Sequence, residues 1–184
     1  MNATGIVRHM DDLGRVVVPK EIRRTMRIRE GDPLEIFTDR EGGIILKKYS
    51  PIGELADFSK EYSDSLQQTI GNIIIVCDRD NIISVSGITK KEYLDKKVSS
   101  DLENVLGNRK SIAFGEGSAQ TIPLFEDEDV AGRYSSQIVS PILADGDIIG
   151  AVIIASKEQG KKFSDTELKL AETATLFLGR QMES

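Results

Sequence analysis

The sequence predicts an α+β fold in two domains, a small β-rich one followed by a larger one that combines helices with an antiparallel sheet. Within residues 1–50, short strand-like runs bounded by turn residues surround one short helix. Ser50-Pro51 then opens a long amphipathic stretch, and residues 72–184 alternate apolar strands with tight turns before a last helix. We therefore expect domains at 1–50 and 72–184, joined by a helix over 51–71.

The composition excludes several classes of protein. Lys and Arg total 24 against 30 Asp and Glu, which gives a net charge of −6, and the apolar fraction of 39% is enough for at least one core. A single cysteine excludes an internal disulfide framework and a zinc site built from several cysteines. No apolar run reaches the roughly 18 residues that span a bilayer, and no signal-peptide core is present. We expect a cytoplasmic protein that does not bind a membrane.

The first 50 residues are predicted to form two hairpins around the helix. Pro19 suits the first helical position because its missing N–H is not needed there. The helix should end near Met26 or Ile28. The expected strands are Gly5–Met10, Arg15–Val18, Leu34–Thr38 and Ile44–Tyr49, with turns at Asp11–Gly14, Glu30–Pro33 and Asp39–Gly43.

A unit of this size buries too little apolar surface to be stable alone without disulfides or a metal. The strand over Gly5–Met10 also lacks a clean alternation of apolar and polar residues. Both observations are explained if two copies interleave to form one core. The alternative is that the second domain covers the first.

A helix is predicted from Pro51 to about Ile70, with Ser50 as its N-cap. Its apolar residues recur every three or four positions, which is the period of one helical face. This stripe could pair with a partner chain or lie on the downstream sheet, and the sequence leaves both open. The stripe consists of Ile52, Leu55, Phe58 or Ser59, Tyr62, Leu66 and Ile70.

Residues 72–184 are predicted to form a sheet with few helices. Thr89–Glu92 is a possible capping box for a short helix, and Ser164–Glu167 is a clear one for the last helix, whose Leu168, Ala171, Thr175 and Leu178 share a face. Residues 107–117 should be a loop. The expected strands are Ile73–Cys77, Ile82–Val85, Ala119–Leu124, Tyr134–Ile142 and Ile148–Ala155, the last two joined by a tight turn at Ala144–Asp147.

Charge is distributed unevenly along the chain. Residues 1–29 carry seven basic and three acidic side chains, whereas residues 51–184 have a net charge of −8. Lys20, Arg23, Arg24 and Arg27 fall at i, i+3, i+4 and i+7 of the short helix and form one stripe opposite Ile22 and Met26. Cations at this spacing repel one another, so the arrangement is unfavourable unless an anion binds to it. Phosphate is a suitable anion because arginine can form bidentate hydrogen bonds with it. Arg8 and Arg15 could extend the patch, although an unpartnered solvated stripe is the other interpretation.

No other residues predict catalysis, a metal site or a cofactor. Glu126–Asp129 lacks a ligand-loop pattern and should be a solvated acidic loop, and Cys77 should be a buried, inert thiol. His9 has no nucleophile partner nearby in sequence, and Gly115–Gly117 is not a phosphate loop. A small-molecule pocket could be lined by Ser86, Ser111 or Ser118, but no spacing selects them.

Residues 3–48 resemble the AbrB-type swapped-hairpin family of bacterial transition-state regulators. The resemblance is carried by Gly5–Arg8, Asp11–Arg24 and Gly31–Ile36. It implies a homodimer of interleaved hairpins that binds double-stranded DNA through arginines, and the matching positions are Arg8, Arg15, Arg23 and Arg24. Lys20 and Arg27 are added from the helix geometry alone. His9 stands where relatives often carry another basic residue.

The second domain resembles a GAF domain in its strand Ile73–Cys77, its turn Asp145–Asp147 and its strand Gly150–Ile154. A swapped hairpin followed by a GAF domain resembles a family of regulators from spore-forming bacteria, which implies activation and repression of sporulation genes, a nucleoid-associated protein of the forespore and no enzymatic activity. We expect the connecting helix and the last helix to form a bundle between subunits, which would join two dimers into a homotetramer or stiffen one dimer. An antitoxin-like protein and a metabolite sensor remain alternatives.

Overall fold

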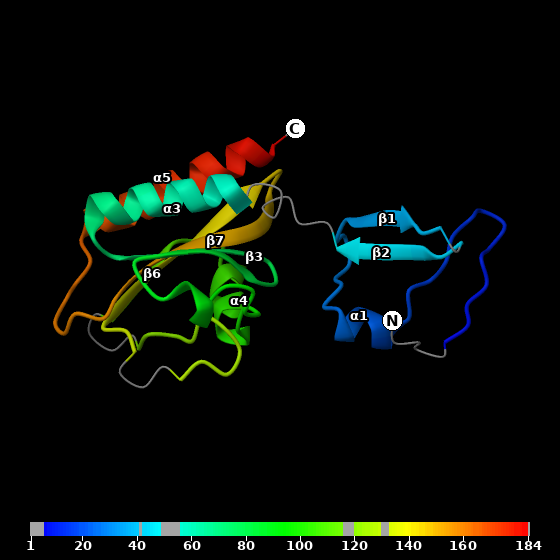
Figure 1. The fold of residues 1–184 in the computed structure, drawn as a ribbon, viewed down its shortest axis with the longest axis horizontal. Helices are drawn as coiled ribbons and strands as arrows, with labels where there is room; N and C mark the ends of the chain where they lie inside the picture. Colours follow the sequence, from blue (N-terminus) through cyan, green and yellow to red (C-terminus); the bar gives the residue numbers. More distant parts are fainter. Residues whose placement is uncertain (1–5, 41, 49–55, 116–119, 130–132, 184) are drawn as a thin grey trace. The chain divides into compact units, whose positions relative to one another are not determined.

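Helices and antiparallel sheets make up both parts of the chain, which confirms the α+β prediction (Figure 1). The structure is a computed structural model, and it describes residues 6–40, 42–48, 56–115, 120–129 and 133–183. The chain divides into two compact units, residues 1–49 and 50–184. Among the described residues, no helix is both long enough and apolar enough to cross a bilayer.

The first unit contains helix α1 (Lys20–Thr25) and a two-stranded sheet of β1 (Leu34–Thr38) and β2 (Ile44–Lys48). The strands pair antiparallel with Ile36 opposite Leu46, as the turn at Asp39–Gly43 predicted. In that turn the Asp39 carboxylate accepts the Gly43 amide at 2.6 Å, and Gly42 has a positive φ of 86°. Pro19 lies directly before α1 as its N-cap, one position earlier than expected.

The strands predicted at Gly5–Met10 and Arg15–Val18 are wrong for the described single chain. Residues 6–10 and 15–18 have no strand pairing there, although the turn between them forms. Their side chains are exposed except for the half-buried Val18, with Val7 at 77% and Val17 at 71%. A β-branched run becomes a strand only when a neighbouring strand takes up its N–H and C=O groups.

The second unit is a five-stranded antiparallel sheet in the order β4-β3-β7-β6-β5. The elements are α3 (Ala56–Ile70), β3 (Ile73–Asp78), β4 (Ile82–Ser86), the 3-10 helix η1 (Lys90–Glu92), α4 (Ser100–Gly107), β5 (Ile112–Phe114), β6 (Ser136–Ala144), β7 (Asp147–Ser156) and α5 (Asp165–Met182).

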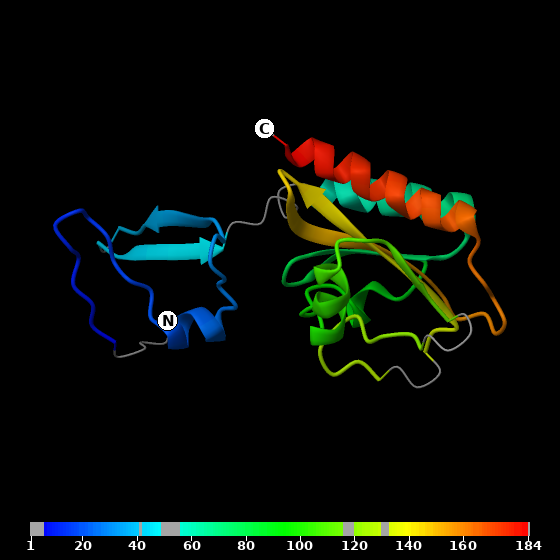
Figure 2. The same cartoon turned by 180° about the vertical axis from the view of Figure 1, so that it is seen from behind.

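Helices cover both faces of this sheet (Figures 1 and 2). On one face, α3 and α5 bury side chains such as Leu66 and Leu178 against β3, β6 and β7. On the other, α4 and the loops around it enclose the largest core cluster, which includes Tyr93, Leu102 and Ile153. Because each central strand is buried on both faces, β3 consists almost entirely of apolar residues.

Two local predictions in this unit are confirmed. Asp145 and Gly146, both with positive φ, form the turn between β6 and β7, the geometry that an Asp-Gly hairpin favours. The capping box of α5 is present, with the Ser164 side chain accepting the Thr166 amide and Glu167 accepting the Ser164 amide at 2.8 Å. The bonds from Ser164 lower the pKa of the Glu167 carboxyl.

Three other predictions need correction. Thr89 makes no side-chain cap, and only the short η1 follows it; the capping serine is Ser99, which accepts the Leu102 amide at the start of α4. The strand predicted at Ala119–Leu124 is not formed by the described residues 120–124. The backbone N–H and C=O of Ile122 instead form hydrogen bonds with the side chain of buried Gln137, so they do not pair with another strand. Residues 112–114 form β5 where we predicted a loop.

The apolar stripe of the connecting helix lies on the sheet. Leu66 is buried in a cluster with Ile74 and Ile138, and Tyr62 and Ile70 pack beside it. This is one of the two alternatives that the sequence left open. Ile52 and Leu55 lie outside the described residues. Cys77 is fully buried in β3, as predicted, and this burial, together with the neighbouring Asp78 carboxylate, raises the pKa of its thiol to about 12.

A close approach of α5 to β6 generates a stability prediction. A Cβ atom at Gly179 would meet the carbonyl oxygen of Leu143 more closely than real Cβ atoms approach other atoms. We expect Gly179→Ala to destabilise the protein by about 1–3 kcal/mol, since α5 must shift, despite the better helix propensity of alanine. Gly107→Ala in α4 is the matched control, because nothing lies within 4 Å of its Cβ position. Chemical denaturation of both variants tests this, and equal stabilities would contradict it.

Candidate nucleic-acid interface

Helix α1 carries the cations that the sequence singled out. Lys20, Arg23 and Arg24 are exposed, and their spacing places them on one face, while Ile22 is half-buried. Arg23 and Arg24 also lie in the last helical turn, where the helix dipole favours positive charge and offsets part of their mutual repulsion. The helix therefore presents a cationic face to solvent.

Arg27 lies beyond the end of α1, so its predicted place at i+7 of the stripe is wrong. The chain leaves the helix through a reversal in which the Ile28 amide donates to the Arg23 carbonyl at 2.7 Å and the Arg27 amide donates to the Arg24 carbonyl at 3.3 Å. Arg27 occupies the left-handed position of this reversal, with φ of 51°, where glycine is usual. The Lys48 ammonium donates to the Arg27 carbonyl at 3.1 Å and links β2 to this bend.

Arg8 and Arg15 flank the turn that starts at Asp11. The Asp11 carboxylate accepts the Leu13 and Arg15 amides at 3.0 and 2.7 Å, and it also binds the Arg15 Nε at 2.8 Å. The backbone and side-chain bonds from Arg15 lower the pKa of Asp11. Asp11 thus orients Arg15, whose side chain stays 69% exposed, and Arg8 is exposed as well.

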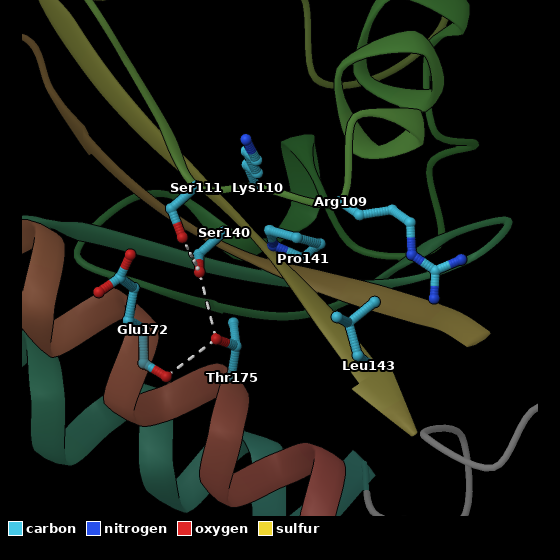
Figure 3. A pocket seen from close by; sticks show the side chains of 8 residues that line it. All are labelled: Arg109, Lys110, Ser111, Ser140, Pro141, Leu143, Glu172 and Thr175. Carbon is cyan, nitrogen blue, oxygen red and sulfur yellow. Dashed lines mark hydrogen bonds between the residues drawn. The ribbon is translucent and has the colours of Figure 1, made fainter. Parts of the chain in front are cut away.

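The second unit contains an open pocket of about 420 Å³ beside α5 (Figure 3). A chain of hydroxyl groups forms one side of it: Ser111 Oγ lies 2.8 Å from Ser140 Oγ, which lies 3.2 Å from Thr175 Oγ1. Its other lining residues are Arg109, Lys110, Pro141, Leu143 and Glu172. Ser111 is the one of the three serines singled out in the sequence that lines this pocket.

The other two candidate serines lie elsewhere. Ser86 is buried in β4 and donates to the Asp64 carboxylate of α3, so it helps to attach that helix to the sheet. Ser118 lies outside the described residues. The pocket combines cations, hydroxyl groups and a carboxylate, yet its charged side chains are exposed and do not enclose a ligand.

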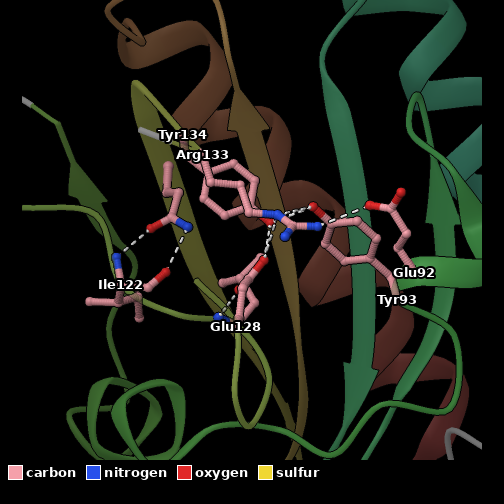
Figure 4. A network of polar contacts seen from close by, with 8 residues as sticks. Glu92, Tyr93, Ile122, Glu128, Arg133 and Tyr134 are labelled. Atoms are coloured by element: carbon pink, nitrogen blue, oxygen red, sulfur yellow. Dashed lines mark hydrogen bonds and ion pairs between the residues drawn. The ribbon is translucent and has the colours of Figure 1, made fainter. Parts of the chain in front are cut away.

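The acidic run at Glu126–Asp129 is not a fully solvated loop, and this prediction is corrected. Glu128 is buried: its Oε2 accepts the Leu124 amide at 2.6 Å, and its Oε1 accepts the Tyr134 hydroxyl at 2.7 Å and pairs with Arg133 at 3.1 Å (Figure 4). Burial, together with its bonds to Tyr93 and Glu128, raises the pKa of Tyr134.

The sequence did not point to this network, because its members are far apart along the chain and follow no local pattern. The same holds for Arg109, Ser140, Glu172 and Thr175 of the pocket. The signals that the sequence offered were the charged run Glu126–Asp129 directly after Phe125 and the four consecutive polar residues 108–111 after α4. Within the described ranges, no group of three or more His, Cys, Asp or Glu side chains could hold a metal ion.

The fold of the second unit is that of a GAF domain. A crystal structure of the GAF domain from an Acinetobacter phosphoenolpyruvate-protein phosphotransferase superposes with a TM-score of 0.57 at 13% identity, covering 70% of this chain and 81% of that one. At this identity the likeness concerns the fold alone. It matches the GAF resemblance seen in the sequence.

Comparison with known sequences identifies both units. The chain is 56% identical to stage V sporulation protein T of Bacillus subtilis, over all of this chain and 99% of that protein. It is 47% identical to the transition state regulatory protein AbrB of the same organism, over 41% of this chain and 77% of that protein.

Two family models match the chain in succession. Residues 11–54 match the model of the bacterial antitoxin MazE, described as antidote-toxin recognition. Residues 54–183 match the model of the C-terminal part of stage V sporulation protein T, described as a transcription factor. The chain therefore belongs to the stage V sporulation protein T family and is a sporulation transcription regulator with an AbrB-like unit and a GAF-like domain.

Proposed function

We propose that this regulator binds double-stranded DNA as a homodimer, through Arg8, Arg15, Lys20, Arg23, Arg24 and Arg27 of each copy. The exposed cationic face of α1 is the observation that carries the proposal. Phosphate oxygens accept bidentate hydrogen bonds from arginine, and such contacts position a protein on the duplex. We further propose that the protein activates some promoters and represses others, in the cytoplasm of the forespore and in association with the nucleoid.

The charge distribution supports a local anionic partner. Residues 1–29 have seven basic and three acidic side chains, while the whole chain has a net charge of −6. An acidic protein is repelled by DNA at long range, so a cationic segment must make the contact. The release of counterions from the duplex supplies a large share of the binding free energy and makes that free energy depend on salt concentration.

Exposed apolar side chains of the first unit support the dimer. Among the residues that the structure describes, thirteen large apolar side chains are exposed; eleven of them lie in residues 6–46, and they include Met10, Leu13 and Ile36. The segments at 6–10 and 15–18 also lack strand partners in the described chain. An interleaved second copy would supply both the missing strands and the missing apolar cover.

The antitoxin-like alternative concerns the first unit, because the MazE model matches residues 11–54. Toxin binding in such a protein would use a chain segment beyond that unit, whereas here a folded GAF-like domain follows. A metabolite sensor is compatible with the pocket at Ser111, although that pocket is open. Neither alternative accounts for the exposed cations of α1 as directly as DNA does.

We propose that the GAF-like domain assembles dimers into a tetramer through the solvent-facing sides of α3 and α5. Leu176 of α5 is 57% exposed, and a groove between the helices is lined by Tyr62, Phe177 and two polar residues of α3. Linking two DNA-binding dimers would raise the effective concentration of the second at a neighbouring site. Such linkage would allow tight binding to paired DNA sites that each match the preferred sequence only poorly.

The first prediction concerns salt dependence. DNA affinity should fall by orders of magnitude over a few-fold rise in salt concentration. Arg24→Ala should weaken binding about tenfold and reduce the log–log salt slope by about two, since each dimer loses two phosphate contacts. Arg40→Ala, which removes one exposed charge from the β1–β2 turn, is the control. Gel-shift titrations at several salt concentrations measure both, and equal losses would refute the assignment to α1.

The second prediction concerns the dimer. The isolated fragment 1–50 should sediment as a dimer, and its melting temperature should rise with protein concentration because unfolding separates the chains. Circular dichroism melts over a hundredfold range of concentration measure this. A folded monomer at micromolar concentration would show that the first unit covers its own apolar surface.

The third prediction concerns the tetramer. Leu66 and Leu178 are buried within the domain, so substitutions there would unfold it, and Leu176 is the residue to change. Leu176→Asp should halve the mass measured by light scattering and weaken binding to paired DNA sites. Leu143→Asp, which changes the other exposed large apolar residue of the described second unit, should leave the mass unchanged. If both variants keep the parental mass, the helices are not the assembly surface.

A further inference from the structure

Arg133 inserts a guanidinium group into the side of the GAF-like core that faces α4 (Figure 4). Its side chain is only 23% exposed. The Nε atom lies 2.9 Å from the Tyr93 hydroxyl and 3.1 Å from the Glu128 carboxylate, and Nη2 lies 3.1 Å from the Glu92 carboxylate. The edge of the guanidinium thus meets a hydroxyl and two carboxylates.

Aromatic rings provide further contacts for the same group. The Arg133 Cζ atom lies 5.0 Å from the centre of the Tyr93 ring and 5.7 Å from that of Phe125. The two rings meet edge to face, with centroids 5.4 Å apart and planes at 82°. Cations over aromatic rings at such distances are attracted by the ring quadrupole, most strongly where water is excluded. The partners therefore recognise both the charge and the flat shape of a guanidinium.

A second layer of hydrogen bonds fixes these partners. The single proton of the Tyr134 hydroxyl goes to Glu128, so the Tyr93 hydroxyl, 2.8 Å away, donates to Tyr134 and accepts from Arg133. Glu128 also accepts the Leu124 amide, and its side chain is fully buried. The partners come from η1 and its flank and from the turn after Leu124, and Tyr93 and Glu128 are also bonded to groups other than Arg133.

We propose that Tyr93, Phe125, Glu128 and Glu92 form a binding site for a guanidinium group, and that Arg133 is the internal ligand that fills it. The site would take a small guanidinium compound only when Arg133 is absent. In the native chain this side of the domain is then complete without a diffusible ligand. A metabolite acting on the protein would have to bind elsewhere, such as at the open pocket beside α5.

A simple ion pair would not need this arrangement. Moving two charges out of water costs about as much as their attraction returns, so a buried pair is poor evidence of stabilisation by itself. Lysine would satisfy Glu128 as a point charge, but it could not reach two carboxylates and a hydroxyl with one planar group. The combination of flat aromatic contacts with edge-on acceptors is specific to a guanidinium.

Chemical rescue of the full-length Arg133→Ala variant tests the proposal. The variant should melt at a lower temperature than the parent, because Glu128 loses its buried counter-ion. Methylguanidinium chloride at about 20 mM should raise the melting temperature of the variant by about 2 °C or more, measured against sodium chloride at the same ionic strength. The parent and Arg109→Ala, which removes an exposed guanidinium of the same domain, should not respond.

Arg133→Lys separates charge from shape. It should melt between the parent and Arg133→Ala, and it should not respond to methylguanidinium. Full stability of this lysine variant would show that the site reads charge alone and would overturn the proposal, as would the absence of a selective rise for Arg133→Ala.

Folding of the alanine variant is itself a second readout. If Arg133→Ala does not fold unaided, recovery of folded protein only in methylguanidinium supports the proposal, and no recovery contradicts it. These measurements do not involve DNA, so their failure is separate from a failure of the proposed function.

Discussion

The first unit carries more apolar surface than its own described residues can cover. Residues 6–48 contain one helix of six residues and a two-stranded sheet, which together are too small to enclose a core. Val7, Val17 and Ile36 are consequently among the most exposed apolar side chains of the chain. Arg8 lies beside Val7, and Arg15 lies directly before another exposed valine, Val16. In the proposed dimer, burial of these apolar side chains against the second copy would both complete the fold of the unit and fix the positions of the neighbouring arginines.

The second unit has the opposite property. Its central strands are buried on both faces, and only Leu143 and Leu176 are large exposed apolar side chains among its described residues. The domain therefore needs no partner to complete its core, and any assembly through it must use the outer sides of its helices. Under the proposed assembly, dimerisation of the first unit is therefore a condition of its folding, whereas association of the second unit only raises the affinity for DNA. A mutation can then weaken assembly at α5 without unfolding the domain.

Sequence patterns identified those features whose physical causes are local. The Asp145-Gly146 turn and the Ser164–Glu167 capping box depend on a few adjacent residues, and both form. The strand at 15–18 was wrong because its pairing needs another strand. The capping-box spacing at Thr89–Glu92 did not mark a cap, whereas Ser99 caps α4 without a Glu or Gln three residues later. Within the candidate site, the helical period correctly placed Lys20, Arg23 and Arg24 on one face of α1. It misplaced Arg27, because the helix ends at Thr25 and Arg27 adopts a left-handed conformation beyond it. The burial of Glu128 depends on Arg133 and Tyr134, which no local pattern connects to it.

The two sets of arginines show why net charge alone says little about function. Arg23 and Arg24 remain hydrated at the surface, where they can exchange water and counterions for phosphate oxygens. Arg133 is largely shielded from water and contacts fixed protein partners instead. Burial by itself lowers the pKa of its guanidinium, but the hydrogen bond to Tyr93 and the negative charge of Glu128 outweigh this effect, so the pKa is raised. That group stays charged at any pH that leaves the protein folded, and it is not available to an external anion. The chain thus uses one residue type in two ways, and the degree of solvation decides whether an arginine can recognise DNA or completes a core.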